Sequence, residues 1–188
     1  MALTVTPLAP FSEVLLIKNQ VFGDARGFFL ESFNKKTFHA ATGLSPDFVQ
    51  DNHSRSNKGV LRGIHFQRAP HAQGKLVRVV NGAVFDVAVD LRRSSPTFGK
   101  WAGYRLSAVG GEMLWIPPGF GHAFLVLEDQ TDFLYKTTDY YAPECEGSVA
   151  WDDSTIAIDW RAEVSRSEIL LSDKDRSAPR LQDAHVFT

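Results

Sequence analysis

Two histidines stand at the ends of similar spacings, and their side chains are the first candidates for chemistry. Five residues separate Gly59 from His65, and five separate Gly111 from the run Pro117-Pro118-Gly119-Phe120-Gly121-His122. A neutral imidazole can abstract a proton near pH 7, and it is also the commonest metal ligand. The pair therefore indicates either proton transfer or metal binding.

The two spacings resemble the two motifs of the cupin superfamily, in which three histidines and a glutamate hold a metal ion. Gln67 stands where the second histidine would be, the glutamate has no clear counterpart, and Val126 replaces an asparagine. Two imidazoles without a carboxylate or thiolate partner rarely form a catalytic metal site, which usually has three protein ligands. We therefore predict a cupin-type barrel with no metal, in which His65 and His122 face one interior.

Longer runs resemble the dTDP-4-dehydrorhamnose 3,5-epimerase family. They are residues 21–32, 50–54, 60–67, 73–78, 86–92, 95–99 and 133–136, and the match keeps the family's order from about residue 13 to about residue 180. The resemblance implies a cofactor-free isomerase of rhamnose and deoxysugar synthesis. It would invert C3 and C5 of dTDP-4-dehydro-6-deoxy-D-glucose to give dTDP-4-dehydro-L-rhamnose. It would act in the cytoplasm, as a homodimer whose chains share site residues.

This reaction needs a base, a group that holds an enolate, and an acid on the opposite face, because both carbons flank the C4 carbonyl. By resemblance, His65 is the base, Tyr135 is the acid, and Lys75 lies beside the C4 oxygen. Asp175 would orient His65 and stabilise the imidazolium. Asp173 is a rival for that position because the C-terminal tail is longer than the family pattern.

The resemblance also assigns the residues that would bind the sugar nucleotide. His122 would contact the sugar and support the same oxyanion, while the guanidinium groups of Arg26 and Arg62 suit diphosphate oxygens. Tyr141 could stack on thymine. The other expected binding residues are Phe28, Glu31, Gln50, Asn52, Glu146 and Lys174. In a homodimer, Arg26 and Glu31 would serve the ligand of the neighbouring chain.

Strands have to position these side chains, and the apolar runs predict most of them. Strands are expected over residues 13–17, 27–33, 100–107, 113–116, 123–127 and 133–138, with a turn-like link over 22–27. Residues 34–41 predict a helix that Gly43 and Pro46 end. Asn81-Gly82 lies between the runs 76–80 and 83–91, which predicts a hairpin with a type I′ turn.

Short strands at close spacing favour a sandwich or barrel. After Asp152 the pattern weakens, and we expect short helical turns and loops packed around the barrel. The predicted fold is mostly β, a double-stranded β-helix (cupin jelly-roll barrel) with N-terminal strands and short peripheral helices. One such domain would span residues 1–188.

Composition and charge disfavour several other classes of protein. A net charge of −2 argues against general nucleic-acid binding, and the longest apolar runs are too short to span a membrane. The single cysteine, Cys145, cannot form a disulfide within the chain, and the start of the sequence does not resemble a signal peptide. Residues 52–85 hold six Arg or Lys and no acid, which fits a local anion site or a solvated basic face.

Alternatives to double epimerisation stay open at this point. A relative could invert only C3 or only C5, or could be a ketoisomerase; retention of His65 and Tyr135 favours the double reaction. A metal-dependent cupin oxygenase is disfavoured by Gln67. A non-catalytic sugar or nucleotide-binding module is disfavoured by the full set of His65, Lys75 and Tyr135. Taken alone, Tyr135 fits a core tyrosine and Lys75 a solvated strand lysine.

Overall fold

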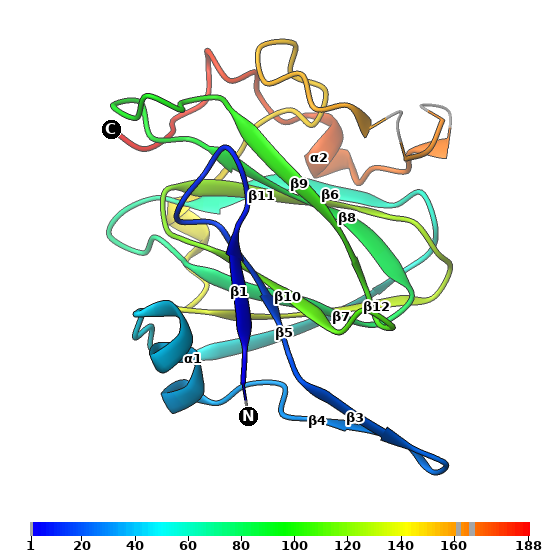
Figure 1. Ribbon diagram of the computed structural model, residues 1–188. Helices are drawn as coiled ribbons and strands as arrows, with labels where there is room; N and C mark the ends of the chain where they lie inside the picture. The colour runs from blue at the N-terminus through cyan, green and yellow to red at the C-terminus, as the bar shows by residue number, and fades with distance from the viewer. Residues whose placement is uncertain (1, 161–162, 166–167) are drawn as a thin grey trace.

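Two antiparallel sheets packed face to face form the body of the protein, as the computed structural model in Figure 1 shows. The structure describes residues 2–160, 163–165 and 168–188. The six-stranded sheet has the order β1 (Thr4–Pro7), β2 (Leu15–Lys18), β10 (Glu112–Ile116), β7 (Lys75–Asn81), β12 (Thr131–Thr137) and β5 (Gln50–Ser56). The five-stranded sheet has the order β13 (Glu146–Ser148), β6 (Leu61–Gln67), β11 (Phe120–Val126), β8 (Ala83–Asp90) and β9 (Trp101–Ser107). The mostly β architecture expected from the sequence is confirmed.

Side chains that alternate along the strands produce three apolar layers. The layer between the sheets includes Val77, Leu114, Phe124 and Phe133. The outer face of the six-stranded sheet packs Leu76, Met113 and Trp115 against Phe38 of α1 (Lys35–Thr42). The outer face of the five-stranded sheet packs Ile64, Val87 and Leu125 against Val149, Trp160 and Leu181 of the C-terminal segment. Because both faces of β8 are covered, all eight of its residues are buried.

The helix predicted over residues 34–41 is observed as α1, displaced by one residue at each end. Asn34 caps α1 by accepting hydrogen bonds from the backbone of Lys36 and Thr37, and Gly43 ends the helix in the left-handed region at φ 74°. After Asp152 the described residues form turns, loops and the short α2 (Asp173–Arg176), as expected. Among the described residues, no helix is long and apolar enough to cross a membrane.

The predicted hairpin across Asn81-Gly82 is wrong. β7 pairs with β10 and β12, whereas β8 pairs with β9 and β11, so the two residues carry the chain from one sheet to the other. Gly82 has φ 77°, and a Cβ there would lie 2.2 Å from Oγ1 of Thr131. A glycine turn is therefore required at this corner, but its sequence does not distinguish a hairpin from a crossing between sheets.

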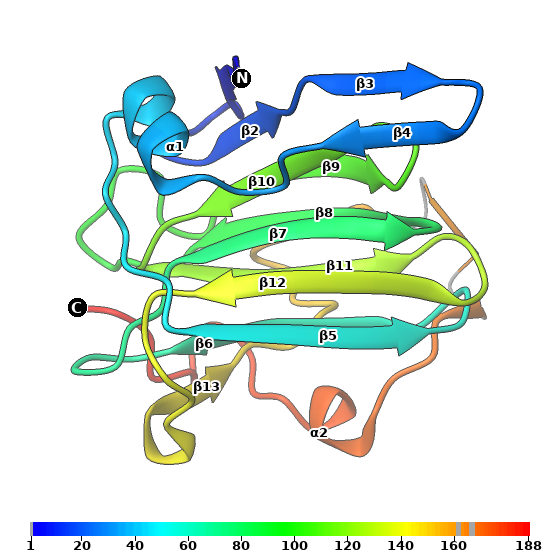
Figure 2. The ribbon, with the colours of Figure 1, turned by 90° about the horizontal axis from the view of Figure 1, so that it is seen from below.

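A hairpin arm projects from the barrel where the sequence predicted a turn-like link. β3 (Val21–Asp24) pairs with β4 (Gly27–Leu30) as a separate two-stranded sheet, and the strand expected over 27–33 ends at Leu30. Figures 1 and 2 show the arm extending beyond the two large sheets. Phe28 is 72% exposed and Phe29 is 62% exposed. Exposed apolar patches of this kind are typical of interaction surfaces.

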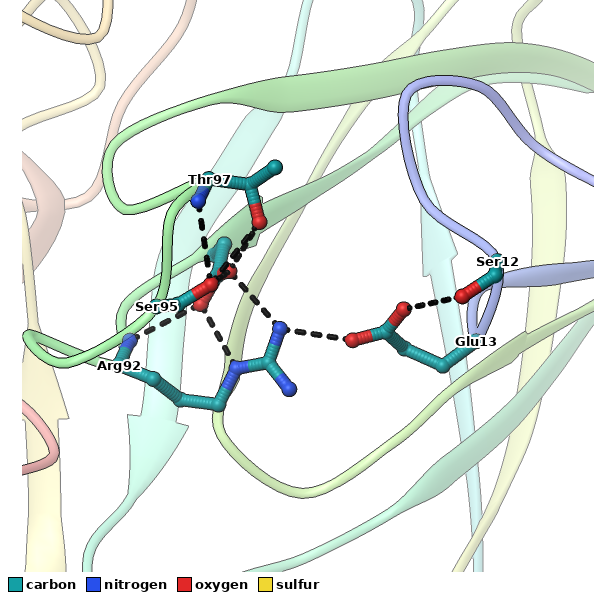
Figure 3. Close-up of polar contacts among 6 residues, drawn as sticks. Ser12, Glu13, Arg92, Ser95 and Thr97 are labelled. Carbon is teal, nitrogen blue, oxygen red and sulfur yellow. Dashed lines mark hydrogen bonds and ion pairs between the residues drawn. The ribbon is translucent and has the colours of Figure 1, made fainter.

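A buried carboxylate fastens the N-terminal segment to the loop that follows β8 (Figure 3). Asp90 accepts hydrogen bonds from Nε and Nη2 of Arg92 at 2.8 Å, from Ser95 at 2.5 Å and from Thr97 at 2.6 Å. Arg92 also donates to Glu13 at 2.7 Å. Burial alone would raise the pKa of Asp90, but these hydrogen bonds outweigh it and lower the pKa to about 2. The network is internally satisfied and helps to hold the barrel together.

Candidate active site

Neighbouring strands of the five-stranded sheet place the two motif histidines side by side. His65 of β6 lies directly opposite His122 of β11 in the ladder. Nε2 of His65 lies 2.5 Å from Oδ1 of Asp175, and Nε2 of His122 lies 3.0 Å from Oδ2 of Asp86. The centre of the site is therefore two adjacent histidine–aspartate pairs.

The carboxylate of Asp175 orients the His65 ring. Asp175 lies in α2, is buried, and also accepts a hydrogen bond from the Ser172 hydroxyl at 2.7 Å. Burial alone would raise the pKa of Asp175, but the hydrogen bonds from His65 and Ser172 outweigh it and lower the pKa. With Nε2–H donated to an ionised carboxylate, Nδ1 of His65 carries the lone pair that a base needs. The rival Asp173 is exposed and does not occupy this position.

Lys75 begins β7 and lies on the same face of the sheet as Val77, toward the interior. Burial lowers the pKa of Lys75 to about 8, although the charges of Asp86 and Glu146 oppose this. Burial likewise lowers the pKa of His122, opposed by Asp86 and assisted by the charges of Lys75 and His65. His122 is therefore neutral at pH 7, while Lys75 is mostly protonated.

Tyr135 lies on the six-stranded sheet, as Lys75 does, opposite the sheet that bears the two histidines. It lies on β12 across from Asn52 and on the inner face beside Phe133, whose ring stacks on Phe124 at 4.1 Å. Burial raises the pKa of Tyr135, with the charge of Arg62 opposing and that of Glu146 adding to the effect. Tyr135 therefore keeps its proton at neutral pH. Tyr135 lies opposite Val77 in the β7–β12 ladder, and alternation puts Lys75 on the same face as Val77, so Tyr135 and Lys75 both face the layer between the sheets.

Several predicted binding residues lie on β5 and β6, which belong to different sheets and overlap in the view of Figure 2. Arg62 is exposed and donates to the Ser56 hydroxyl at 3.0 Å. Gln50 donates to Oδ1 of Asn52 at 3.0 Å. Nδ2 of Asn52 is buried and has no hydrogen-bond partner among the residues that the structure describes. That amide is a donor to which a ligand can bind.

Three further predicted residues are linked to one another. The hydroxyl of Tyr141 donates to Oε2 of Glu146 at 3.0 Å, and Nζ of Lys174 lies 2.6 Å from Oε1 of the same carboxylate. Burial alone would raise the pKa of Glu146, but the hydrogen bonds from Lys174 and Tyr141 outweigh it and lower the pKa. Glu146 pairs with Gln67, two residues from His65 on β6, so the strand ladder brings these expected nucleotide contacts near the histidine pair.

The remaining three predicted residues belong to the arm or its base. Arg26 is exposed and pairs with Asp24, Phe28 is exposed, and Glu31 accepts a hydrogen bond from Asn34 at 3.1 Å. The two strands of the arm pair only with each other. Within one chain, the structure does not bring Arg26 and Phe28 to the histidine pair.

Asp86 is a site residue that the sequence analysis did not identify. It is completely buried on β8 and accepts from His122, and its charge also acts on Lys75. A signal was present, because a carboxylate within a continuous apolar strand needs a partner. That partner comes from another strand, so the sequence alone did not reveal it.

The donor groups do not fit a cupin metal centre. His65 and His122 each direct Nε2 at a carboxylate, and the amide of Gln67 is bonded to backbone groups of two loops. Within residues 2–160, 163–165 and 168–188, no three His, Cys, Asp or Glu side chains are grouped to hold a metal ion. An enzyme built in this way on a cupin-type barrel moves protons between its own side chains and a substrate.

Comparison with known proteins identifies the family. The family model of dTDP-4-dehydrorhamnose 3,5-epimerase matches residues 9–183. A curated dTDP-4-dehydrorhamnose 3,5-epimerase of Shigella flexneri is 54% identical over 93% of this chain and 94% of its own length. The chain belongs to the dTDP-4-dehydrorhamnose 3,5-epimerase family, which confirms the resemblance seen in the sequence.

Solved structures agree on the fold. An epimerase of Legionella pneumophila, in complex with dTDP-4-keto-L-rhamnose, has a TM-score of 0.90 at 47% identity and covers 96% of this chain and 93% of its own. A 3′-monoepimerase of Streptomyces bikiniensis, in complex with dTDP-quinovose, has a TM-score of 0.86 at 34% identity. It covers 94% of this chain and 88% of its own. The cupin-type barrel is therefore shared by relatives that invert different numbers of centres.

Proposed function

We propose that His65 and Tyr135 act on opposite faces of the sugar as this chain epimerises dTDP-4-dehydro-6-deoxy-D-glucose at C3 and C5 to dTDP-4-dehydro-L-rhamnose. The chain is an isomerase of its family, and its 54% identity to a curated 3,5-epimerase favours the double reaction over inversion of one centre. The observation that carries the assignment is the oriented His65–Asp175 pair on the five-stranded sheet, opposite the six-stranded sheet that bears both Lys75 and Tyr135.

The geometry suggests a role for each group. Nδ1 of His65 takes the proton from C3 or C5, and the electron pair of the broken C–H bond moves into the C4 enolate. The ammonium group of Lys75 stabilises that negative charge. Tyr135 then delivers its proton to the opposite face of the carbon. The phenolate regains a proton from solvent while the imidazolium of His65 releases its own.

His122 is better suited to the sugar than to the enolate. It is neutral at pH 7 because burial lowers its pKa, and its Nε2–H is donated to Asp86. In that tautomer Nδ1 is an acceptor, and an acceptor cannot stabilise an oxyanion. We therefore propose that Nδ1 of His122 accepts a hydrogen bond from a sugar hydroxyl and that Lys75 stabilises the enolate.

Solvent exchange tests the proposed reaction directly. When purified protein is incubated in D2O with the 4-keto sugar nucleotide, we expect deuterium at both C3 and C5 and the L-configured product by NMR. Deuterium at one carbon alone would identify a single-site epimerase. Binding of dTDP without any exchange would identify a binding module and overturn the proposal.

The charge of Lys75 predicts how activity depends on pH. Lys75 is protonated below its pKa of about 8, so kcat/KM should fall as pH rises through 8 and the amine loses its charge. The pKa of Tyr135 is raised, so this acid keeps its proton across the same range. Lys75→Arg keeps the charge at every accessible pH and should remove this alkaline limb, even though its rate is lower. An unchanged limb in Lys75→Arg would show that another group titrates.

The arm supports a homodimer whose chains complete each other's sites. Its phenylalanines are exposed, and Arg26 offers a guanidinium group at a distance from the chain's own histidine pair. We propose that Arg26, Phe28 and Glu31 contact the nucleotide bound to the partner subunit. The same nucleotide would be contacted by Arg62 of the partner subunit and Asn52 of the partner subunit, from the barrel that binds it. A cytoplasmic location, which the family resemblance implies, stays a prediction.

Complementation between two inactive variants tests the shared site. Arg26→Ala and His65→Ala should each lack activity as homodimers, since each removes one essential group from every site. In a mixed dimer, one site has His65 from the first chain and Arg26 from the second, so co-expressed chains with different tags should regain activity. Mixed dimers that stay inactive, or a protein that elutes as a monomer, would contradict this arrangement.

A further inference from the structure

The loop that carries Tyr141 is bonded to both sheets, to β5 of the six-stranded sheet and to β6 of the five-stranded sheet. On one side, Oε1 of Gln50 in β5 accepts a hydrogen bond from the backbone N–H of Tyr141 at 3.0 Å. On the other side, Oε1 of Gln67 in β6 accepts from the backbone N–H of Ala142 at 2.9 Å. Two glutamines from different sheets therefore hold consecutive peptide groups of this loop.

Gln67 has more contacts than a single tether. Its Nε2 donates to the backbone oxygen of Tyr140 at 3.1 Å and to that of His71 at 2.8 Å. The side chain is only 4% exposed, and its donors and its acceptor are all used on backbone groups of two loops. A buried amide with this set of partners fixes the relative position of the loops it joins, because each lost bond would leave a polar group unsatisfied.

The hydroxyl of Tyr141 is bound by the residue that pairs with Gln67. Gln67 lies opposite Glu146 in the β6–β13 ladder, and Oε2 of Glu146 accepts from the Tyr141 hydroxyl at 3.0 Å. The peptide groups on both sides of Tyr141 and its phenol are thus held by two residues, Gln67 and Glu146, that pair with each other in the ladder. Its ring remains 55% exposed, which makes it a preorganised stacking surface rather than a core residue.

A second pair of contacts fastens the two loops to each other. Nδ1 of His71 lies 3.0 Å from Oδ2 of Asp139, and Nε2 of Gln73 donates to the backbone oxygen of Asp139 at 2.8 Å. Both contacts involve Asp139, two residues before Tyr141, and partly exposed side chains. Gln67 is the buried member of this set and bonds backbone groups of both loops.

We infer that Gln67 is a positioning residue for nucleotide recognition, because it holds the loop on which Tyr141 presents its ring to the base. The inference rests on the proposed function, in which Tyr141 stacks on thymine. Gln67 touches neither the histidine pair nor Tyr135 through any of its hydrogen bonds. It occupies the position of the second motif histidine in metal-binding cupins, so here that position supports a binding loop.

Removing the amide separates binding from chemistry. Gln67→Leu keeps the size of the side chain and removes all three hydrogen bonds. We expect the Kd of dTDP, measured by calorimetry, and the KM of the sugar nucleotide to rise about tenfold, which corresponds to 1.4 kcal/mol. The kcat should stay within about twofold, because His65, Lys75 and Tyr135 keep their positions. Gln182→Leu, at an exposed glutamine of the C-terminal segment, is the matched control and should change neither constant.

A double-mutant cycle decides whether Gln67 acts through Tyr141. Tyr141→Ala should weaken dTDP binding by itself, and Gln67→Leu should then have little further effect. Additive effects, or a fall in kcat with an unchanged Kd for dTDP, would overturn the inference. If Tyr141→Ala leaves dTDP binding unchanged, the proposed stacking fails first, and the inference fails with it.

Hydrogen exchange supplies a readout that does not depend on catalysis. In Gln67→Leu, the amides of Tyr141 and Ala142 should exchange faster, while amides of β7 and β12 keep their protection. If the leucine variant does not fold, Gln67→Glu keeps the acceptor for Ala142 N–H and removes the two donated bonds. That variant should show a rise in Kd in the same direction, and an unchanged Kd would contradict the inference.

Discussion

His65→Ala should abolish solvent exchange at both C3 and C5 while dTDP still binds. The imidazole is the base for both carbons in the proposed reaction, and Asp175 cannot replace it because that carboxylate lies behind the ring in α2. A positioned base contributes roughly 10²- to 10⁴-fold, so kcat should fall by at least about 10²-fold. The expected nucleotide contacts come from other residues, such as Arg62 and Tyr141, so the Kd of dTDP should change little.

Two further variants show whether the loss is specific to the base. His185→Ala removes an exposed imidazole from the C-terminal segment and should exchange both protons at the wild-type rate. Asp175→Asn keeps the His65 ring but replaces the carboxylate that stabilises the imidazolium, so exchange should be slowed at both carbons. Exchange at either carbon in His65→Ala at the wild-type rate would show that a different base serves that carbon.

The sequence predicts local elements well and their partners less well. The helix over 34–41 and the strands over 100–107 and 113–116 depend on capping residues and apolar runs, which are properties of adjacent residues. The failed hairpin across Asn81-Gly82 had the correct turn residues. Pairing of β7 with β10 and β12 is decided by burial between sheets, and segments about 35 and 55 residues further along the chain provide it.

The candidate site shows the same difference between residues in local motifs, which the sequence identifies, and residues paired across the fold, which it does not. His65 and His122 can be identified from the sequence because each stands at a fixed spacing from a glycine in its motif. The choice between Asp175 and Asp173 depends on how α2 packs against β6, and only the structure shows that Asp175 faces His65. Asp86 was missed because its role depends on a histidine two strand positions away in another strand. Contacts between side chains that are distant in the sequence are therefore identified only from the structure.

Tyr135→Phe should separate proton removal from proton delivery. The phenol is buried beside Phe133 on the sheet opposite His65, and its raised pKa keeps it protonated, so it is an acid at neutral pH. Phenylalanine keeps the ring and its packing but has no proton to deliver. His65 can still form the enolate and return a proton from its own face, so deuterium should enter C3 or C5 with retention of configuration.

NMR of the sugar nucleotide in D2O distinguishes these outcomes. In Tyr135→Phe we expect slowed but measurable exchange together with at least about a 10²-fold loss of L-configured product, since the opposite-face acid is absent. Tyr140→Phe is a matched control, because this exposed tyrosine on the neighbouring loop contacts Gln67 through its backbone oxygen. Full product yield from Tyr135→Phe would mean that water or another group protonates the opposite face. The division of roles between the two sheets would then have to be given up, even if His65 were still the base.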